Sequence, residues 1–359
     1  MKKKLRIAQV APLWFPIPPK KYGGVERIVH YLTEGLVKKG HNVTLFASGD
    51  SKTKAKLVPG WPQSLNKEKI KGKPISWKNS VFPLLNISQA FEQAHKFDII
   101  HIHENKLCLS NFFTSFIKTP VVITIHDEFP TPEFKSRWAL FTKYKKNNYI
   151  SISKSHQKLG KKIGINFVDN IYNGIDFSLF KFNKNKGEHL TWLGRSAAKK
   201  GAEEAIIIAK KAKEKLLLAG RIDVNSPVSL EYYRNHMKPY FNKNIKYIGE
   251  VNDSQKNKFL GNAKALLYPI SWEEPFGLVM AEALACGTPV IVFDRGSARE
   301  VIKDGKTGFI VKNIREAVAA VKKIDQIDRR DCRKWVEENF SIEKMVDNYE
   351  KLYYDILKK

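Results

Sequence analysis

The sequence predicts an α/β protein with two domains, each built on a parallel β-sheet. Its 359 residues are enough for two complete hydrophobic cores. In both halves of the chain, short apolar runs typical of buried strands alternate with stretches that have helical periodicity. Polar residues follow several of the apolar runs, at the strand ends where open parallel sheets bind their ligands.

The first half is expected to begin with a strand at residues 5–10 and a helix at residues 25–38. Ile28, Leu32 and Leu36 recur at four-residue steps, which places them on one face of that helix. Residues 50–80 are rich in Lys, Ser, Pro and Trp and have no clear period, and we interpret them as an excursion toward a partner or acceptor. Further strands are expected at residues 42–47, 98–102, 121–125 and 149–153.

A polar stretch at residues 181–188 is predicted to link the two domains. The expected domains are residues 1–180 and 181–340, followed by a last helical segment at 341–359. In the second half, strands are expected at residues 189–193, 216–219, 245–248, 265–269 and 290–293. Helices are expected at residues 201–212, 230–238, 254–260 and 342–357, with two more beginning near residues 314 and 328.

The composition is that of a globular protein in water, with 43% hydrophobic and 28% charged residues. No run of 18 apolar residues occurs, so no membrane-spanning helix is predicted. The basic start of the chain lacks an uninterrupted apolar core and reads better as a first strand than as a signal peptide. The three cysteines have no metal-ligand spacing, and we expect a reducing, cytoplasmic location.

The formal net charge of +27 raises the question of an anionic partner. The lysines are scattered along the chain, and no nucleic-acid-binding motif accompanies them. We therefore expect no nucleic-acid partner. A lysine-rich composition explains the charge, and a peripheral contact with the anionic inner face of a membrane is a further expectation.

Residues 271–291 are the most informative stretch of the chain. An apolar strand leads into a loop that carries Glu274, and a helix that starts near Gly277 carries Glu282. At about 1.5 Å per helical residue, the two carboxylates lie up to roughly 12 Å apart. The free N–H groups of a helix N-terminus between them form an anion site. A nucleoside-diphosphate sugar has hydroxyls and phosphates at this spacing.

Two further stretches have residues suited to a phosphate ligand. Gly23 and Gly24 follow the first strand and open a helix, where glycine permits close backbone approach; a plain helix-entry turn is the alternative. Arg195 and Lys200 lie at the same place in the second domain and suit a diphosphate. Solvated cations before a helix are the alternative there.

Three histidines occur at strand ends in the first domain. His101 and His103 project from the same face of one strand, and His126 ends the next. A zinc site is one interpretation, although no fourth ligand has suitable spacing, and structural histidines are the other. His126 precedes Asp127 and can hydrogen-bond a sugar hydroxyl in its neutral form. Neither an Asp-x-Asp clamp nor a phosphate-binding P-loop sequence is found, so no metal holder is evident.

Taken together, these motifs resemble the retaining family 4 glycosyltransferases of the GT-B fold. The resemblance implies two Rossmann-like domains that face each other across a cleft, with the C-terminal helix crossing back to the N-terminal domain. One small departure is Ser196-Ala-Ala, where leucine-rich spacers are commoner. The matching segments, in order, are residues 23–26, 98–103, 124–127, 151–153, 173–176, 194–201 and 274–282, the last being the specific Glu-x7-Glu signature.

The resemblance implies catalytic roles for four residues. His126 would bind the 6-hydroxyl of the donor hexose, and Glu274 would bind its 3-hydroxyl. Arg195 and Lys200 would hold the departing diphosphate. Glu282 would bind the ribose, Val251 would meet the nucleobase through its backbone, and the other implied donor-binding residues are Gly23, Gly24, Phe276, Gly277 and Leu278.

The implied reaction is transfer of a glucose-type hexose from a nucleotide sugar, with UDP as the expected nucleotide. Anomeric configuration would be retained, and neither a metal nor another cofactor would be required. The acceptor, a small molecule, a glycan or a lipid-linked sugar, is not readable from the sequence. The alternatives are a related nucleotide-sugar epimerase, a non-enzymatic basic protein that binds polyanions, and a zinc hydrolase built on the histidines.

Overall fold

A computed structural model describes residues 3–70, 73–74, 79–104, 108–224 and 226–358, and the chain divides into two compact units. Unit 1 comprises Met1–Gly174 and Ile342–Lys359, and unit 2 is Ile175–Ser341. Residues 181–188, expected to be a linker, therefore lie inside unit 2. There the Asn183 amide donates to the Cys286 carbonyl at 3.1 Å, so this polar stretch is tied to the unit.

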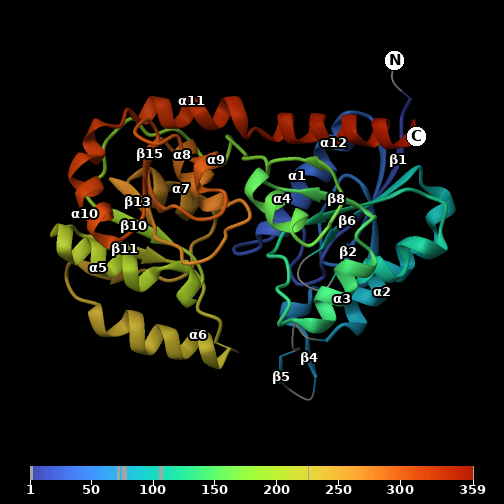
Figure 1. The fold of residues 1–359 in the computed structure, drawn as a ribbon, viewed down its shortest axis with the longest axis horizontal. Coiled ribbons are helices and arrows are strands. Elements are labelled where there is room, and N and C mark those ends of the chain that lie inside the picture. Colours follow the sequence, from blue (N-terminus) through green and yellow to red (C-terminus); the bar gives the residue numbers. More distant parts are fainter. Residues whose placement is uncertain (1–2, 71–72, 75–78, 105–107, 225, 359) are drawn as a thin grey trace. The chain divides into compact units, whose positions relative to one another are not determined.

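The described residues of unit 1 form a seven-stranded parallel sheet with the order β3-β2-β1-β6-β7-β8-β9 (Figure 1). The chain leaves β1 toward β3 and then returns to β6 on the other side of β1. This switch point between β1 and β6 is where open α/β sheets bind ligands. The strands are β1 (Arg6–Val10), β2 (Asn42–Ser48), β3 (Lys56–Trp61), β6 (Ile99–Glu104), β7 (Val121–Ile125), β8 (Asn148–Ser151) and β9 (Phe167–Asn170).

Helices cover the sheet of unit 1, and the last helix of the chain is one of them. Ile28, Leu32 and Leu36 are buried on the first helix, as predicted. The last helix lies against the first in Figure 1. Gly35 permits this approach, because a Cβ there would lie 2.4 Å from Val346. The helices are α1 (Gly24–Lys38), α2 (Val81–Glu92), α3 (Lys135–Lys143), α4 (Lys154–Lys161) and α12 (Ile342–Leu357).

The described part of residues 50–80, for which the sequence shows no clear period, contains three short strands. β3 extends the sheet parallel to β2, and a short antiparallel pair, β4 (Lys69–Ile70) and β5 (Lys73–Pro74), follows it. β3 contains Pro59 and Gly60, which weaken a strand pattern and are tolerated because β3 is an edge strand. Residues 71–72 and 75–78 of this stretch lie outside the described residues.

Unit 2 has a six-stranded parallel sheet within its described residues, in the order β12-β11-β10-β13-β14-β15. Its switch point lies between β10 and β13. The two parallel sheets confirm the predicted fold class. The strands are β10 (Leu190–Leu193), β11 (Leu216–Ala219), β12 (Ile245–Tyr247), β13 (Ala265–Tyr268), β14 (Val290–Phe293) and β15 (Gly308–Val311), the last of which was not predicted.

The helices of unit 2 include one whose buried residues surround a carboxylate. α8 (Leu278–Ala285) is buried continuously from Met280 to Ala285, so the helix is covered on all sides over that stretch. The other helices are α5 (Ala202–Ala212), α6 (Pro227–Tyr232), α7 (Asp253–Gly261), α9 (Ala298–Val301), α10 (Ile314–Lys323) and α11 (Arg329–Asn339).

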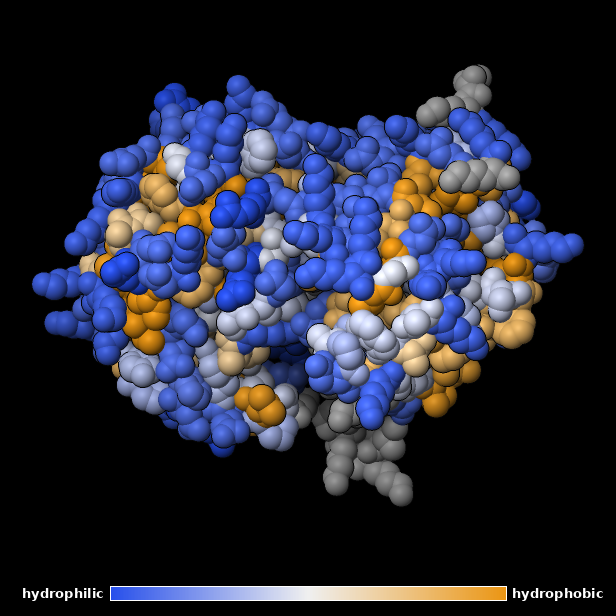
Figure 2. Space-filling view, in the orientation of Figure 1, coloured by the Kyte–Doolittle hydropathy of each residue, from blue (hydrophilic) through white to orange (hydrophobic). Residues whose placement is uncertain are grey.

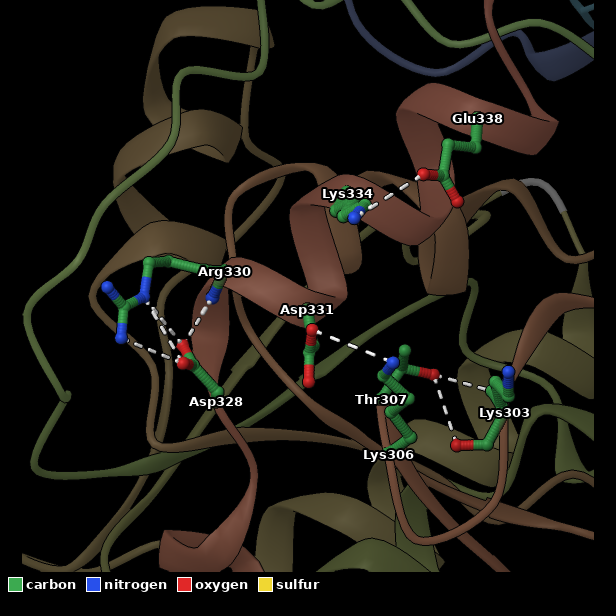
Figure 3. Close-up of polar contacts among 8 residues, drawn as sticks. All are labelled: Lys303, Lys306, Thr307, Asp328, Arg330, Asp331, Lys334 and Glu338. Carbon is green, nitrogen blue, oxygen red and sulfur yellow. Dashed lines mark hydrogen bonds and ion pairs between the residues drawn. The ribbon is translucent and has the colours of Figure 1, made fainter.

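Ion pairs around α11 are exposed and stabilise the surface of unit 2 only weakly (Figure 3). Asp328 caps the helix, and its side chain lies 3.0 Å from the Arg330 guanidinium. The Lys306 ammonium lies 3.9 Å from Asp331. These charges face water and do not converge on a common point, so they do not mark a ligand site.

The face drawn in Figure 2 is largely hydrophilic, in keeping with the 63 Lys and Arg residues of the chain. Among the helices of the described residues, none has the length and apolar content needed to cross a bilayer. All three cysteines are buried as free thiols. The cytoplasmic location and the membrane contact stay predictions.

Candidate active site

Glu274 lies in the loop that follows β13, beside the switch point of unit 2. Its side chain is only 9% exposed. Its Oε2 atom accepts hydrogen bonds from the Lys200 ammonium at 2.6 Å and from the Tyr268 hydroxyl at 2.5 Å. Among the described residues, no group hydrogen-bonds Oε1. One carboxylate oxygen is thus fixed, and the other is available to a ligand hydroxyl.

The loop around Glu274 is held by the turn that follows β14. The Ser297 amide donates to the Glu274 carbonyl at 3.0 Å, and the Ser297 hydroxyl donates to the Phe276 carbonyl at 2.7 Å. A Cβ at Gly296 would lie 2.3 Å from the Glu274 backbone, so only glycine permits this contact. The Phe276 side chain is buried against Phe340. These contacts fix the carboxylate in place before any ligand binds.

Lys200 reaches Glu274 from the loop between β10 and α5. The Trp192 indole donates to the Lys200 carbonyl at 2.8 Å. Gly201 has a φ of 73°, and a Cβ there would lie 2.1 Å from the Pro269 carbonyl oxygen, so glycine lets the two loops touch. The Lys200 ammonium also lies 4.4 Å from the centre of the Trp272 ring, a cation–π distance. Its position is therefore set by backbone and side chain together.

Arg195 occupies the same loop, but its side chain is exposed. The next residue, Ser196, is buried and anchors the loop through hydrogen bonds to Arg221 and Ser229. The structure thus brings Lys200 and Glu274 together and leaves Arg195 at the surface, where it is accessible to an anionic ligand.

Glu282 is buried in α8 and pairs with a lysine that sequence reasoning missed. Lys256, on α7, places its ammonium 2.6 Å from Glu282 Oε1. Glu282 Oε2 is buried and has no hydrogen-bond partner among the described residues. An unpartnered buried carboxylate oxygen is costly. A ligand hydroxyl would satisfy it.

The remaining predicted donor-binding residues of unit 2 lie at two backbone turns. Gly277, with a φ of 76°, precedes α8, and Leu278 is the first residue of that helix. The first N–H groups of a helix have no intrahelical partner and attract anions. Val251 follows the turn at Gly249, whose carbonyl accepts from the Gly220 amide at 2.9 Å.

His126 lies in unit 1, directly after β7. Its ring contacts a hydrogen-bonded network that includes the two neighbouring histidines, His101 and His103. Its Nε2 atom lies 3.1 Å from His103 Nδ1. His103 Nε2 lies 2.7 Å from the Gln9 side-chain oxygen Oε1. His101 Nε2 lies 2.7 Å from the Thr124 hydroxyl, and His101 Nδ1 lies 2.6 Å from the Tyr353 hydroxyl. Protein groups therefore contact both ring nitrogens of His101 and of His103. Among the described residues, no set of three acidic, His or Cys side chains is arranged to hold a metal ion.

Burial keeps the three histidines neutral. Burial, with a smaller contribution from the nearby His156, lowers the pKa of His126 to about 3. Burial also lowers the pKa of His101 and of His103 well below the ordinary value, with the neighbouring histidines as a second cause. These rings therefore act as neutral hydrogen-bonding groups at physiological pH.

Gly23 is the N-cap of α1, and Gly24 is the first residue of that helix, after the loop that follows β1. Gly23 has a φ of 147°, and a Cβ there would lie 2.7 Å from the Pro19 side chain. Glu26, in the first turn of α1, is buried close to Gly23. Burial raises the pKa of Glu26 to about 7, although the amides of Phe15 and of Glu26 itself favour the charged form.

Glu26→Gln is expected to make stability less dependent on pH. The pKa of Glu26 is 4.5 in the unfolded chain and about 7 in the folded protein, so between these pH values only the folded protein keeps the proton. The contribution of Glu26 to stability is therefore lost as pH rises through that window. Relative to wild type, the variant should gain about 3 kcal/mol in free energy of unfolding between pH 4 and pH 8. Urea unfolding at both pH values measures the change, with Glu34→Gln on the same helix as the control. An equal pH dependence in wild type and Glu26→Gln would contradict it.

Sequence reasoning missed four residues that support the candidate site: Tyr268, Lys256, Gln9 and Tyr353. Tyr268 ends β13, so the strand-end rule that selected His126 would have found it. Gln9 lies inside β1 and Tyr353 inside α12, and their sequence context is that of ordinary core positions. Lys256 is one of many lysines on predicted helices, and no spacing marks it.

Comparison with known proteins assigns both halves of the chain. A family model for glycosyltransferase family 4 matches residues 22–179, and one for glycosyl transferases group 1 matches residues 175–340. A phosphatidyl-myo-inositol mannosyltransferase from Propionibacterium freudenreichii is 26% identical over 326 residues, which cover 84% of this chain and 80% of that protein. Over 101 residues, 26% of each chain, an N-acetyl-alpha-D-glucosaminyl L-malate synthase from Bacillus anthracis is 36% identical.

Solved structures share the whole fold at low sequence identity. A sucrose-phosphate synthase from Thermosynechococcus elongatus has a TM-score of 0.81 at 19% identity, covering 99% of this chain and all of that one. HepE from Anabaena, in complex with UDP and glucose, has a TM-score of 0.75 at 17% identity, covering 98% of this chain and all of that one. The parallel sheets, the order of the motifs and these matches establish that the chain belongs to glycosyltransferase family 4 and has the GT-B fold.

Proposed function

We propose that this glycosyltransferase moves a glucose-type hexose from a UDP-linked donor to a hydroxyl acceptor, with retention of anomeric configuration. The observation that carries the proposal is a repeated arrangement in unit 2. Glu274 and Glu282 each have one oxygen held by a lysine, and no described residue hydrogen-bonds the other. Two such oxygens suit the hydroxyls at the two ends of a nucleotide sugar. Glu274 binds the hexose in this proposal, and Glu282 binds the ribose.

The diphosphate between these ends needs positive charge as it leaves. Lys200 and the N-terminus of α8 flank the Glu274 loop, and Arg195 is exposed on the loop of Lys200. Preorganised charge of this kind stabilises a leaving anion without reorganisation. The proposed reaction therefore requires no metal ion, and added chelator should leave the rate unchanged.

The proposed chemical step is a same-face substitution at the anomeric carbon. The bond from that carbon to the diphosphate oxygen breaks, and the acceptor oxygen forms the new bond on the same face. The acceptor proton passes to the departing phosphate oxygen. In this mechanism Glu274 and Glu282 orient the donor, and neither acts as a nucleophile.

The relatives support a second candidate for the transferred sugar. Several full-length relatives are named mannosyltransferases, and their lipid-linked acceptor makes a lipid acceptor a reasonable choice for this chain as well. UDP is supported by the UDP complex of a protein with the same fold, and mannose by the named relatives. We propose a glucose-type sugar, with a mannose donor as the second candidate.

A donor screen tests the proposal. The purified protein is heated with UDP-glucose, UDP-galactose, GDP-mannose, ADP-glucose and each free nucleotide, because a ligand of the native state raises Tm. UDP-glucose is expected to give the largest shift, and Glu282→Gln should abolish most of it. Product analysis with a panel of hydroxyl acceptors then identifies the transferred sugar and its anomeric configuration. A larger shift with GDP-mannose would replace the assigned donor.

Two control incubations separate the alternative functions. Donor alone, without acceptor, should yield no epimerised sugar; an epimer would assign the related epimerase reaction instead. A polyanion such as heparin should not compete with the donor at physiological salt. Tight, salt-sensitive polyanion binding together with no donor shift would instead support a non-enzymatic binding protein.

A further inference from the structure

A continuous chain of hydrogen bonds connects His126 with the C-terminal helix of the protein. From His126 it passes through His103 to Gln9 on β1, as described above. The Gln9 amide nitrogen lies 3.1 Å from the Tyr353 hydroxyl of α12, and that hydroxyl lies 2.6 Å from His101 Nδ1. We call these residues (His126, His103, Gln9, Tyr353 and His101) the histidine relay. All belong to unit 1.

The histidine relay is isolated from water along most of its length. Gln9, His101 and Tyr353 are fully buried, and His103 is 2% exposed. The His101 and His103 rings lie with their centroids 4.0 Å apart and their planes tilted by 38°. Buried polar groups of this kind need every donor matched to an acceptor. The arrangement of protons along the relay is therefore determined as a unit.

The orientation of Gln9 sets the direction of every bond in the relay. Its carbonyl oxygen faces His103, and a carbonyl can only accept, so His103 carries its proton on Nε2. His103 is neutral, and its bare Nδ1 must accept from His126 Nε2–H. A neutral His126 then has no proton on Nδ1.

Tyr353 holds Gln9 in that orientation. The Gln9 amide N–H donates to the Tyr353 oxygen, and the Tyr353 hydroxyl donates to His101 Nδ1. His101 then donates from Nε2 to the Thr124 hydroxyl at 2.7 Å. A rotated Gln9 amide would put its N–H groups toward His103 and reverse each of these bonds together.

We propose that Gln9 and Tyr353 are positioning residues that fix the proton of His126 on Nε2 and leave Nδ1 as a hydrogen-bond acceptor for a hydroxyl of the donor sugar. Among the described residues, no protein group hydrogen-bonds His126 Nδ1. The inference rests on the proposed function for the identity of the hydroxyl. The tautomer itself is a property of the protein alone.

Long-range ¹H–¹⁵N correlation of histidine-labelled, ligand-free protein tests the tautomer. The His126 signals are assigned by their loss in His126→Asn. A protonated Nε2 with a bare Nδ1 is expected in wild type. Tyr353→Phe and Gln9→Met, which keep the packing volume, should give a mixture of both tautomers. A bare Nε2 in the wild-type protein would reverse the relay and overturn the proposal.

Donor analogues test the direction of the hydrogen bond to the sugar. Kd is measured for UDP-glucose and for its 6-deoxy and 6-fluoro analogues. Fluorine cannot donate, so both analogues should bind about tenfold more weakly than UDP-glucose, as expected for one lost hydrogen bond. Tyr353→Phe should weaken UDP-glucose binding severalfold and leave the Kd of the 6-deoxy analogue unchanged. Tyr149→Phe, which removes another buried hydroxyl of unit 1, should bind all three donors like wild type.

The outcomes separate this inference from the proposed function. If the tautomer is as expected but all three donors bind equally, the 6-hydroxyl contact is wrong and the positioning of the proton stands. If the 6-fluoro analogue binds like UDP-glucose while the 6-deoxy analogue binds more weakly, His126 donates from Nδ1 and the inference fails. If no donor shifts Tm or binds, the proposed function itself fails, whatever the tautomer.

Discussion

Lys200→Met is expected to lower kcat/KM about 1,000-fold, because it removes a preorganised charge from the leaving group. The loss should appear mainly in kcat, since negative charge on the diphosphate develops in the transition state. The substitution also leaves the nearly buried Glu274 carboxylate without its cation. Breaking such a pair destabilises a protein by about 3–5 kcal/mol. Initial rates and urea unfolding measure the two effects separately.

Two further variants separate charge at the site from general stability. Lys199→Met removes an equal charge from the same loop, where the Lys199 ammonium lies 3.8 Å from the Trp272 ring centre. It should keep kcat/KM within about threefold of wild type, because in the proposed mechanism Lys200 and not Lys199 offsets the charge of the leaving group. Lys200→Met combined with Glu274→Gln should recover stability and stay inactive. Wild-type kcat in either Lys200 variant would exclude Lys200 from catalysis.

Glu282→Gln is expected to weaken donor binding about 100-fold and to change kcat at saturating donor only slightly. A hydrogen bond to a charged acceptor contributes about 1.5–3 kcal/mol, and a ribose contact is made equally in ground and transition states. The variant also leaves the Lys256 ammonium, 14% exposed, without its carboxylate. Calorimetric titration with UDP measures the affinity.

Deoxyribose donors show whether the loss comes from the ribose. Removal of a ribose hydroxyl should weaken binding to wild type and should have little further effect in Glu282→Gln, because the two changes remove the same contact. Lys256→Met is the matched variant for the pair and should weaken UDP binding less than Glu282→Gln does. If the losses in binding free energy from the ribose change and from Glu282→Gln are additive, the ribose does not contact Glu282.

Much of the fold follows from local patterns that the sequence shows plainly. Strands such as β1, β7 and β13 are short apolar runs bounded by polar or turn residues, and burial on both faces makes that pattern strong. Edge strands do not meet this condition. β3 is half-exposed and interrupted by Pro59, so it becomes a strand only by pairing with β2.

The candidate site can be predicted from the sequence where one short stretch contains both the polar side chains and the elements that set their spacing. Glu274 and Glu282 are such a case, because a loop and the following helix fix their spacing. The hydrogen-bond partners of the candidate-site residues come instead from positions far apart in the sequence. Lys200 meets Glu274 over 74 residues, and Gln9 meets Tyr353 over 344. Only the sheet order and the docking of α12 bring these groups together, and no local periodicity encodes either.

The placement of α12 in unit 1 has a consequence for the order of folding during synthesis. Unit 2 is a continuous segment and can complete its sheet while the chain is still on the ribosome. Unit 1 begins first but lacks Tyr353 until all of unit 2 has been translated. Until then the Gln9 amide nitrogen and His101 Nδ1 lack their Tyr353 partner. Unit 1 therefore starts before unit 2 and is completed after it, and termination of the chain before Tyr353 would leave unit 1 with unpaired polar groups in its core.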